Sequence, residues 1–166
     1  MAEPRYLSQG ATFSACKKYR YRLWREWWSL SVRTILWVLL NPSTADAEHL
    51  DPTLRRCLSY SNMWGFGHME IVNIFAWRST DPEGLKHSKD PVGPGNDDAI
   101  LEAAHATDRI VVGWGVHGHY LDRDLAVYEL LRGAHRELHC LGVTKHGHPK
   151  HPLYVPSWEI PTLYHR

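Results

Sequence analysis

The sequence predicts an α/β protein: a three-layer αβα sandwich around a small, mainly parallel four-stranded sheet, with an antiparallel hairpin at its N-terminal end. Short apolar runs rich in branched and aromatic side chains recur along the chain, as in strands buried on both faces. Segments with helical spacing separate these runs. Strands that alternate with helices are joined by crossovers, which make neighbouring strands parallel. No linker or repeat divides the 166 residues, so one domain, 1–166, is expected.

The predicted central strand is the apolar run Ile35–Leu40. It stops at Asn41-Pro42-Ser43, because proline cannot donate a hydrogen bond to a sheet and restricts the residue before it. Asn41 is therefore expected at the carboxyl end of a central strand, where open α/β sheets bind ligands. The same residue types are also common in ordinary loops, so this segment alone leaves both interpretations open.

The segment before the central strand combines strand periodicity with basic charge. Residues 1–12 show little periodicity, whereas side chains alternate from Phe13 to Trp28 as in a strand, and Ser29–Ser31 forms a predicted turn. An antiparallel hairpin with the central strand is expected. Six basic residues and one acid lie between Cys16 and Arg33, interleaved with aromatic residues. This pattern suits a nucleic-acid backbone, and a solvated strand face is the alternative.

The rest of the chain alternates helices and strands. Asp51-Pro52 provides an N-cap acid followed by proline in the first turn, which predicts a helix start. The expected elements are a helix over 52–64, a strand over 69–75, a long loop over 79–95, a helix over 96–105, a strand over 109–113, a helix over 119–132, a strand over 137–141 and a loop-rich tail over 142–166.

The composition is that of an ordinary globular protein, with 43% hydrophobic and 22% charged residues and a net charge of +1. No apolar run approaches the roughly 20 residues of a membrane span, and the N-terminal residues lack a secretion signal. A cytoplasmic protein is expected. Cys16, Cys57 and Cys140 are widely spaced without a CxxC pair, so no disulfide framework is predicted. The phosphate-binding motif GxxxxGK[ST] is absent from the sequence.

Three polar segments follow predicted strands. They are residues 41–43, Asn73 with Arg78, and the histidine-rich residues 145–151. Because the carboxyl ends of parallel strands meet at one edge of a sheet, one composite pocket is expected there.

The order of these motifs over residues 35–153 resembles the uracil-DNA glycosylase superfamily. There, the first core strand ends in a Gly-x-Asp/Asn-Pro loop that positions the hydrolytic water. Residues 39–42 are similar to the branch with asparagine, although Leu39 replaces the glycine. The second strand ends in an asparagine that reads the flipped pyrimidine, and Asn73 matches it. A final His-Pro-Ser motif precedes an apolar wedge, and residues 148–153 are similar to it, with Lys150 in place of the serine.

The resemblance implies a monofunctional DNA glycosylase for a flipped, modified pyrimidine such as glucosylated hydroxymethylcytosine, which leaves an abasic site and serves in phage defence. A monomer that needs no cofactor or metal and has DNA as its partner is expected. The implied catalytic residues are Asn41, His148 and His151, because two His-Pro pairs compete for the motif. The implied substrate-binding residues are Pro42, Ser43, Asn73, Phe75 and Arg78. The implied DNA-binding residues are Lys17, Arg20, Arg22, Lys145, Lys150 and Leu153.

The chemistry of such a reaction leaves one role open. An amide such as Asn41 can orient water but is not a strong general base. Asp46, Glu48 or Asp51 could supply a carboxylate, or could be loop and cap residues only. The long loop over 79–95 could form the wall of a pocket for a bulky base.

Two rival functions fit other features. A metal-dependent hydrolase or nuclease would use His146, His148 and His151 around zinc, with His139 or Cys140. A non-catalytic reader of modified DNA would use the basic, aromatic segment near the N-terminus. Retained zinc would favour the first function, and binding without turnover would favour the second.

Overall fold

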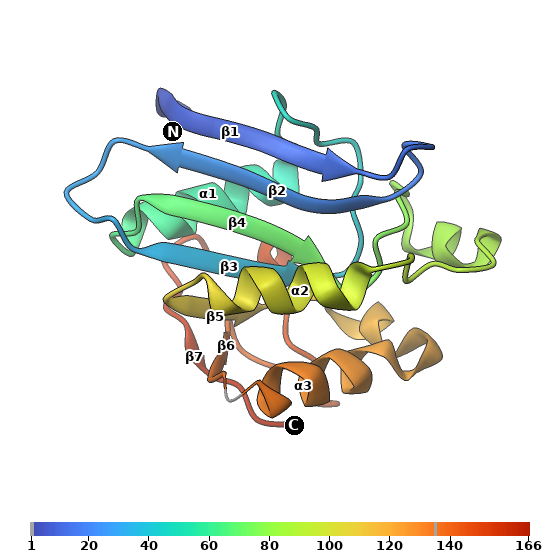
Figure 1. Cartoon of the computed structure of the whole chain (residues 1–166). Coiled ribbons are helices and arrows are strands. Elements are labelled where there is room, and N and C mark those ends of the chain that lie inside the picture. The colour runs from blue at the N-terminus through green and yellow to red at the C-terminus, as the bar shows by residue number, and fades with distance from the viewer. Residues whose placement is uncertain (1, 135) are drawn as a thin grey trace.

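A computed structural model of the chain describes residues 2–134 and 136–166. The strands form one twisted sheet with helices on both of its faces (Figure 1). In chain order the elements are β1 (Tyr6–Phe13), β2 (Arg20–Trp27), β3 (Thr34–Leu39), α1 (Pro52–Met63), β4 (His68–Asn73), the 3-10 helix η1 (Pro82–His87), α2 (Asn96–His105), β5 (Arg109–Val112), the 3-10 segment η2 (Val116–Asp122), α3 (Arg123–Gly133), β6 (Leu138–Cys140), the 3-10 helix η3 (Pro152–Tyr154) and β7 (Thr162–Leu163).

The sheet confirms the predicted α/β class but is larger than expected. In the described part of the chain it has seven strands in the order β1-β2-β4-β3-β5-β6-β7. The four predicted strands form its parallel centre, in which β3 pairs with β4 and β5, and β5 pairs with β6. Strands β1, β2 and β7 add antiparallel pairs at the two sides. The expectation of a mainly parallel, four-stranded sheet is therefore wrong.

The predicted hairpin between the second strand and the central strand is also wrong. β2 pairs with β1 and β4, for example Leu23 with Ile71, because both edges of β3 are already occupied by β4 and β5. β1 lies in the segment that showed little periodicity. It is an edge strand with only Gly10 buried, so it needs no apolar alternation. A Cβ on Gly10 would lie 2.3 Å from the Trp24 ring, which explains the glycine there.

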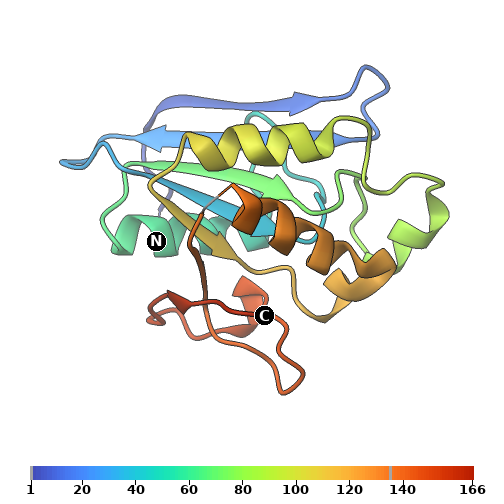
Figure 2. The same ribbon diagram turned by 60° about the horizontal axis from the view of Figure 1, so that its bottom comes forward.

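The helices divide the apolar core into two clusters, one on each face of the sheet. α2 and α3 cover one face and α1 covers the other (Figure 2). On the α1 face, the indole of the fully buried Trp37 donates to Ser61 Oγ at 2.9 Å and stacks on Trp64. The predictions for α1 and α2 are confirmed, and Asp51 caps α1 through Leu54 N at 2.9 Å.

The third helix begins later than its spacing predicted. Leu121 and Asp122 have φ angles of 56° and 52°, so the chain turns into α3 only at Arg123. Leu121 is 62% exposed and does not belong to an apolar stripe, which explains the error. No described helix has the length and apolar character that would let it cross a membrane.

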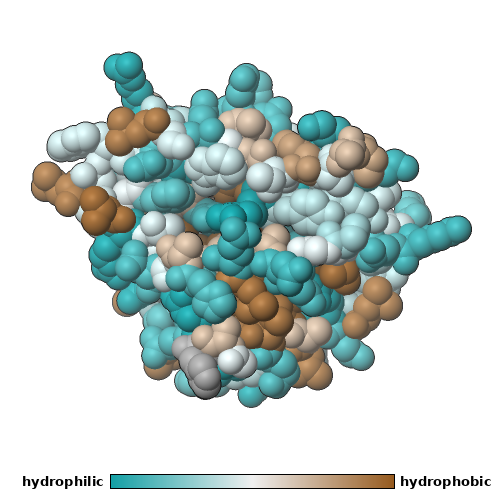
Figure 3. All heavy atoms as spheres, viewed as in Figure 1, coloured by the Kyte–Doolittle hydropathy of each residue, from teal (hydrophilic) through white to brown (hydrophobic). Residues whose placement is uncertain are grey.

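The two ends of the parallel strands differ in character. At their amino ends, the loop between β2 and β3 exposes Trp28, Leu30 and Val32, and hydrophobic spheres gather at that end of the molecule in Figure 3. At their carboxyl ends, the loops that follow β3, β4 and β5 surround a pocket.

Candidate functional site

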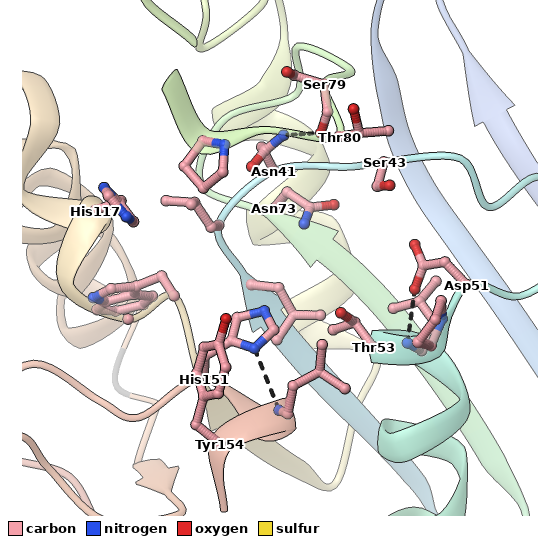
Figure 4. Close-up of a pocket in the computed structure, with 18 of the residues that line it drawn as sticks. Asn41, Ser43, Asp51, Thr53, Asn73, Ser79, Thr80, His117, His151 and Tyr154 are labelled. Carbon is pink, nitrogen blue, oxygen red and sulfur yellow. Dashed lines mark hydrogen bonds between the residues drawn. The ribbon is translucent and has the colours of Figure 1, made fainter. Parts of the chain in front are cut away.

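A pocket of about 600 Å³ lies at the carboxyl ends of β3, β4 and β5 (Figure 4). Its walls are Leu39–Asn41, Ser43 and Thr44 at the end of β3 and after it, residues 51–54 at the start of α1, Asn73 at the end of β4, and loop or 3-10 segments farther along the chain. From those segments the lining residues are Ser79, Thr80, Pro82, residues 114–117, Thr144, Lys150, His151, Leu153 and Tyr154, and Arg20 of β2 also lines the pocket. The predicted convergence of polar loops at this edge of the sheet is therefore present.

Asn41 contributes a hydrogen-bond acceptor to this pocket. Its Nδ2 donates to the carbonyl oxygens of Ser79, at 2.8 Å, and Pro42, at 3.1 Å. Two carbonyl acceptors define which way the amide points, because only the nitrogen can donate. The Oδ1 atom accepts no hydrogen bond from the described residues and is available at the pocket wall. Asn41 can therefore hold a water molecule or accept from an N–H group of a ligand.

Asn73 contributes a donor from the end of the neighbouring strand. Its Oδ1 accepts from the guanidinium of Arg20 at 3.5 Å, and its carbonyl accepts from Asn96 Nδ2 at 2.9 Å. Its Nδ2 has no partner among the described residues and points toward the pocket interior in Figure 4. Asn73 is 2% exposed, so only a ligand inside the pocket can reach this amide.

His151 contributes a second donor. It caps η3, where its Nδ1 accepts from Leu153 N at 3.3 Å, and Pro152 occupies the first position of that turn. Burial lowers the pKa of His151, although Asp51 partly opposes this effect. A neutral ring whose Nδ1 accepts carries its proton on Nε2. Figure 4 shows this second nitrogen facing the pocket.

Asp51 carries the only carboxylate among the described residues that line the pocket. One oxygen accepts from Leu54 N at the start of α1, and the other has no hydrogen-bond partner within the described chain. Asp51 therefore combines the two roles that the sequence left open, since it is both a helix cap and a pocket residue. Asp46 instead accepts from Glu48 N and His49 N in an exposed turn, and neither Asp46 nor Glu48 lines the pocket.

The family model described as "Protein of unknown function (DUF1643)" matches residues 20–153. The chain belongs to this DUF1643 family. The matched region begins at Arg20 and ends at Leu153, so of the pocket residues only Tyr154 lies outside it. Comparison with the curated proteins and with the solved structures gave no match.

In this DUF1643 protein His151, from the second of the two competing His-Pro pairs, lines the pocket. His148 lies elsewhere, with its Nδ1 3.9 Å from Asp124 Oδ2 and its ring next to His119. The two histidines between which the sequence left the choice open therefore have different surroundings, and His151 lines the pocket whereas His148 does not.

Three predicted substrate-binding residues also lie outside the pocket wall. Phe75 is fully buried in the core and packs on Tyr120, so it cannot stack on a ligand. Arg78 donates to Lys17 O at 3.1 Å and lies over the Phe13 ring. Pro42 is buried and holds the loop through its carbonyl. Ser43 does line the pocket.

The predicted DNA-binding residues divide into three groups. Lys17 and Lys145 are exposed and remain surface candidates. Arg22 is ion-paired with Glu70 and lies 3.6 Å from Glu102, so its charge is largely compensated. Lys150, Leu153 and Arg20 line the pocket, and Arg20 is only 1% exposed. Arg20 is therefore placed to meet a ligand in the pocket rather than a phosphate on the strand surface.

The zinc alternative lacks a matching arrangement. No three His, Cys, Asp or Glu side chains among residues 2–134 and 136–166 are placed to hold a metal ion. His146 is exposed, whereas His148 and His151 have different surroundings.

Sequence reasoning missed several pocket residues. Trp114 and His117 follow β5 and line the pocket. The sequence predicts the strand that ends before Trp114, but the polar clusters considered at strand ends did not include His117, which follows it. Ser79 and Thr80 are the first two residues of the long loop over 79–95, for which a role in the pocket wall is predicted, and both line the pocket.

Proposed function

We propose that this DUF1643 protein is a monofunctional DNA glycosylase that acts as a cytoplasmic monomer. It hydrolyses the N-glycosidic bond of a flipped, modified pyrimidine and leaves an abasic site, in defence against phages with modified DNA. The observation that supports this most is the meeting of Asn41 Oδ1, Asn73 Nδ2 and His151 Nε2 in one pocket. They come from three separate segments and provide one acceptor and two donors.

The three groups match the needs of base excision. An extruded base must be recognised, a water molecule must be held near C1′, and negative charge must be stabilised on the departing base. Asn73 donates to an acceptor on the base, and Asn41 orients the water through its free oxygen. His151, neutral and protonated on Nε2, donates to an oxygen of the base as charge develops. The carboxylate of Asp51 stabilises the positive charge that develops on the sugar.

The size of the pocket favours a base that carries a substituent. A volume of about 600 Å³ falls within the range of about 300–1,000 Å³ that holds drug-sized ligands, and a plain pyrimidine is smaller than such a ligand. A glucosylated hydroxymethyl group would use the remaining space. Lys150 and the exposed Leu153 and Tyr154 also line the pocket. The charge of Lys150 is suited to a DNA phosphate, and the side chains of Leu153 and Tyr154 are suited to fill the space that the flipped base leaves in the duplex.

The test is direct measurement of base release. Purified protein is incubated with duplexes that contain uracil, a thymine mismatch, hydroxymethylcytosine or glucosylated hydroxymethylcytosine, followed by alkaline cleavage of the strand and mass spectrometry of free bases. We expect the glucosylated base to be released, and release to fall at least about 100-fold in Asn41→Ala and in His151→Ala. His148→Ala is the matched control, because this histidine lies outside the pocket, and it should stay close to wild type.

Two results would contradict the proposal. The first is the absence of any released base from all four duplexes. Tight binding without release would then favour a non-catalytic reader of modified DNA. The second is equal loss in His148→Ala and His151→Ala, which would show that the pocket does not define the active site. Equal release of plain uracil and of the modified cytosine would contradict the assignment to modified bases.

A further inference from the structure

β2 contains two buried arginines that point to the same side of the sheet. Arg20 is 1% exposed and Arg25 is 0% exposed. Arg20 donates to Ala45 O at 3.0 Å and Arg25 to Asp46 O at 3.1 Å, so both hold the loop that follows β3. Regular alternation would place these two side chains on opposite faces. A register shift beside Tyr21, which no residue of β1 faces, brings Arg20 onto the face of Arg25.

The charge of Arg20 has no counter-ion in direct contact. Its partners are two neutral oxygens, Ala45 O and Asn73 Oδ1, and no described carboxylate lies within 4.0 Å of its guanidinium. Burial lowers the pKa of Arg20 to about 10, with the more distant Asp51 opposing this shift. The side chain is therefore still a cation at neutral pH. A buried cation without a paired anion is costly, and the cost is reduced when an anion arrives.

Only one of the two arginines can meet a ligand. Arg20 lines the pocket, whereas Arg25 does not. Arg20 also contacts Asn73 Oδ1, so it lies beside the amide whose nitrogen faces the pocket interior. A group that accepts from Asn73 Nδ2 is thus brought close to the positive charge of Arg20.

We propose that Arg20 is an anion-binding residue of this pocket and that its ligand is a pyrimidine in its anionic form. This inference rests on the proposed function, where it adds Arg20 to His151 in the stabilisation of the leaving base. In that reaction the C1′–N1 bond breaks and its electron pair stays on the base, while the water oxygen bonds to C1′. The water proton passes to solvent, and the base anion takes up a proton after release. Arg20 holds the base while it carries the charge.

An anionic ligand could also be a phosphate group of the nucleotide, so the experiment separates these sources. The probes are barbiturate, which is a pyrimidine anion at neutral pH, uracil, which is neutral, and inorganic phosphate. Binding is measured by calorimetry and by the fluorescence of the tryptophans, one of which, Trp114, lines the pocket. The variants are Arg20→Gln, Arg20→Lys and the matched control Arg25→Gln, each checked by circular dichroism.

We expect wild type to bind barbiturate at least about 10-fold more tightly than uracil, because a hydrogen bond between Arg20 and an anion is stronger than one between Arg20 and a neutral oxygen. Arg20→Gln should remove this preference, Arg20→Lys should keep part of it, and Arg25→Gln should keep all of it. If Arg20→Gln does not fold, the comparison of barbiturate with uracil on wild type and on Arg20→Lys still decides the question.

Three outcomes would overturn the inference. The first is equally tight binding of uracil and barbiturate by wild type. The second is a loss of the preference in Arg25→Gln as complete as in Arg20→Gln. The third is Arg20-dependent binding of phosphate without binding of barbiturate. Failure of the proposed function gives a different result from these three outcomes. In that case no base is released in the glycosylase assay, while wild type still binds barbiturate more tightly than uracil.

Discussion

Asn41 and Asn73 lie at the ends of adjacent strands, but the same substitution should change the stability of the protein to very different extents at the two positions. Asn41→Asp would add a second carboxylate, beside that of Asp51, to the described pocket wall. In this structure the Asn41 nitrogen donates to Ser79 O and Pro42 O. A carboxylate would instead place an oxygen against two carbonyl oxygens. We therefore expect Asn41→Asp to destabilise the protein.

The size of the effect follows from these contacts. Two hydrogen bonds of about 1 kcal/mol each are lost, and an unsatisfied acceptor adds about 1 kcal/mol at a half-buried position, for a total of about 3 kcal/mol. For a chain of this length, a melting temperature lower by about 6–12 °C is expected. Repulsion by the carbonyls raises the pKa of the new carboxyl group. The loss should therefore be largest near neutral pH and should shrink as the pH falls toward about 4.

Asn73→Asp is the matched control for this substitution. Asn73 Nδ2 has no partner to lose, and a carboxylate there would face Arg20, a cation without a counter-ion. The gain in attraction offsets the desolvation of the new charge, so we expect a change of less than about 1 kcal/mol. Urea denaturation followed by tryptophan fluorescence measures both variants. If Asn41→Asp proves as stable as Asn73→Asp at neutral pH, the assigned orientation of the Asn41 amide is wrong.

Three further predictions concern caps, pH and packing. Asp51→Ala should cost about 1 kcal/mol of unfolding free energy by thermal melting, whereas Asp51→Asn should cost a few tenths, because asparagine also caps helices; equal losses would refute the capping role. Burial lowers the pKa of His151 and of His139, so the unfolded chain binds more protons below about pH 6.5 and stability should fall as the pH drops from there. Replacing both histidines with glutamine should flatten this dependence in denaturation curves, and an unchanged slope would contradict it. Gly113→Ala should destabilise by about 1–3 kcal/mol, because its Cβ would lie 3.1 Å from Pro152 Cδ. Gly133→Ala, with no atom within 4 Å, should be neutral or stabilising, and equal melting temperatures for the two alanine variants would count against this explanation.

Local signals in the sequence predicted the parallel centre of the sheet and the starts of two helices. Ile35–Leu40 is a short apolar run rich in branched residues, which is typical of a strand covered on both faces, and Asp51-Pro52 combines a cap with a favourable first-turn residue. The partner of β2 could not be predicted in this way, because strand pairing depends on which edges are free after β3 is flanked by β4 and β5. Likewise β1, as an exposed edge strand, carries no apolar pattern.

The site was partly predictable for the same reasons. Asn41 and Asn73 end buried strands, so topology alone brings them together. The choice between His148 and His151 depended on a turn and a cap, which two similar His-Pro pairs do not distinguish. The place of Arg20 depended on the register shift beside Tyr21, since regular alternation puts this side chain on the other face. Tertiary contacts therefore decided the parts of the site that spacing left open.

The position of β2 beside β4 has a consequence for the order of folding. β2 precedes β3 in the chain, yet β4, the strand through which β2 joins the rest of the sheet, comes only after the crossover through α1. Until then the β1–β2 hairpin has no place to dock, and closing this longer loop costs chain entropy. We expect the parallel centre to assemble first and the hairpin to join afterwards. Because β2 carries Arg20, the pocket would acquire its buried cation only at this last step, so a folding intermediate that lacks the docked hairpin should not bind the anionic ligand.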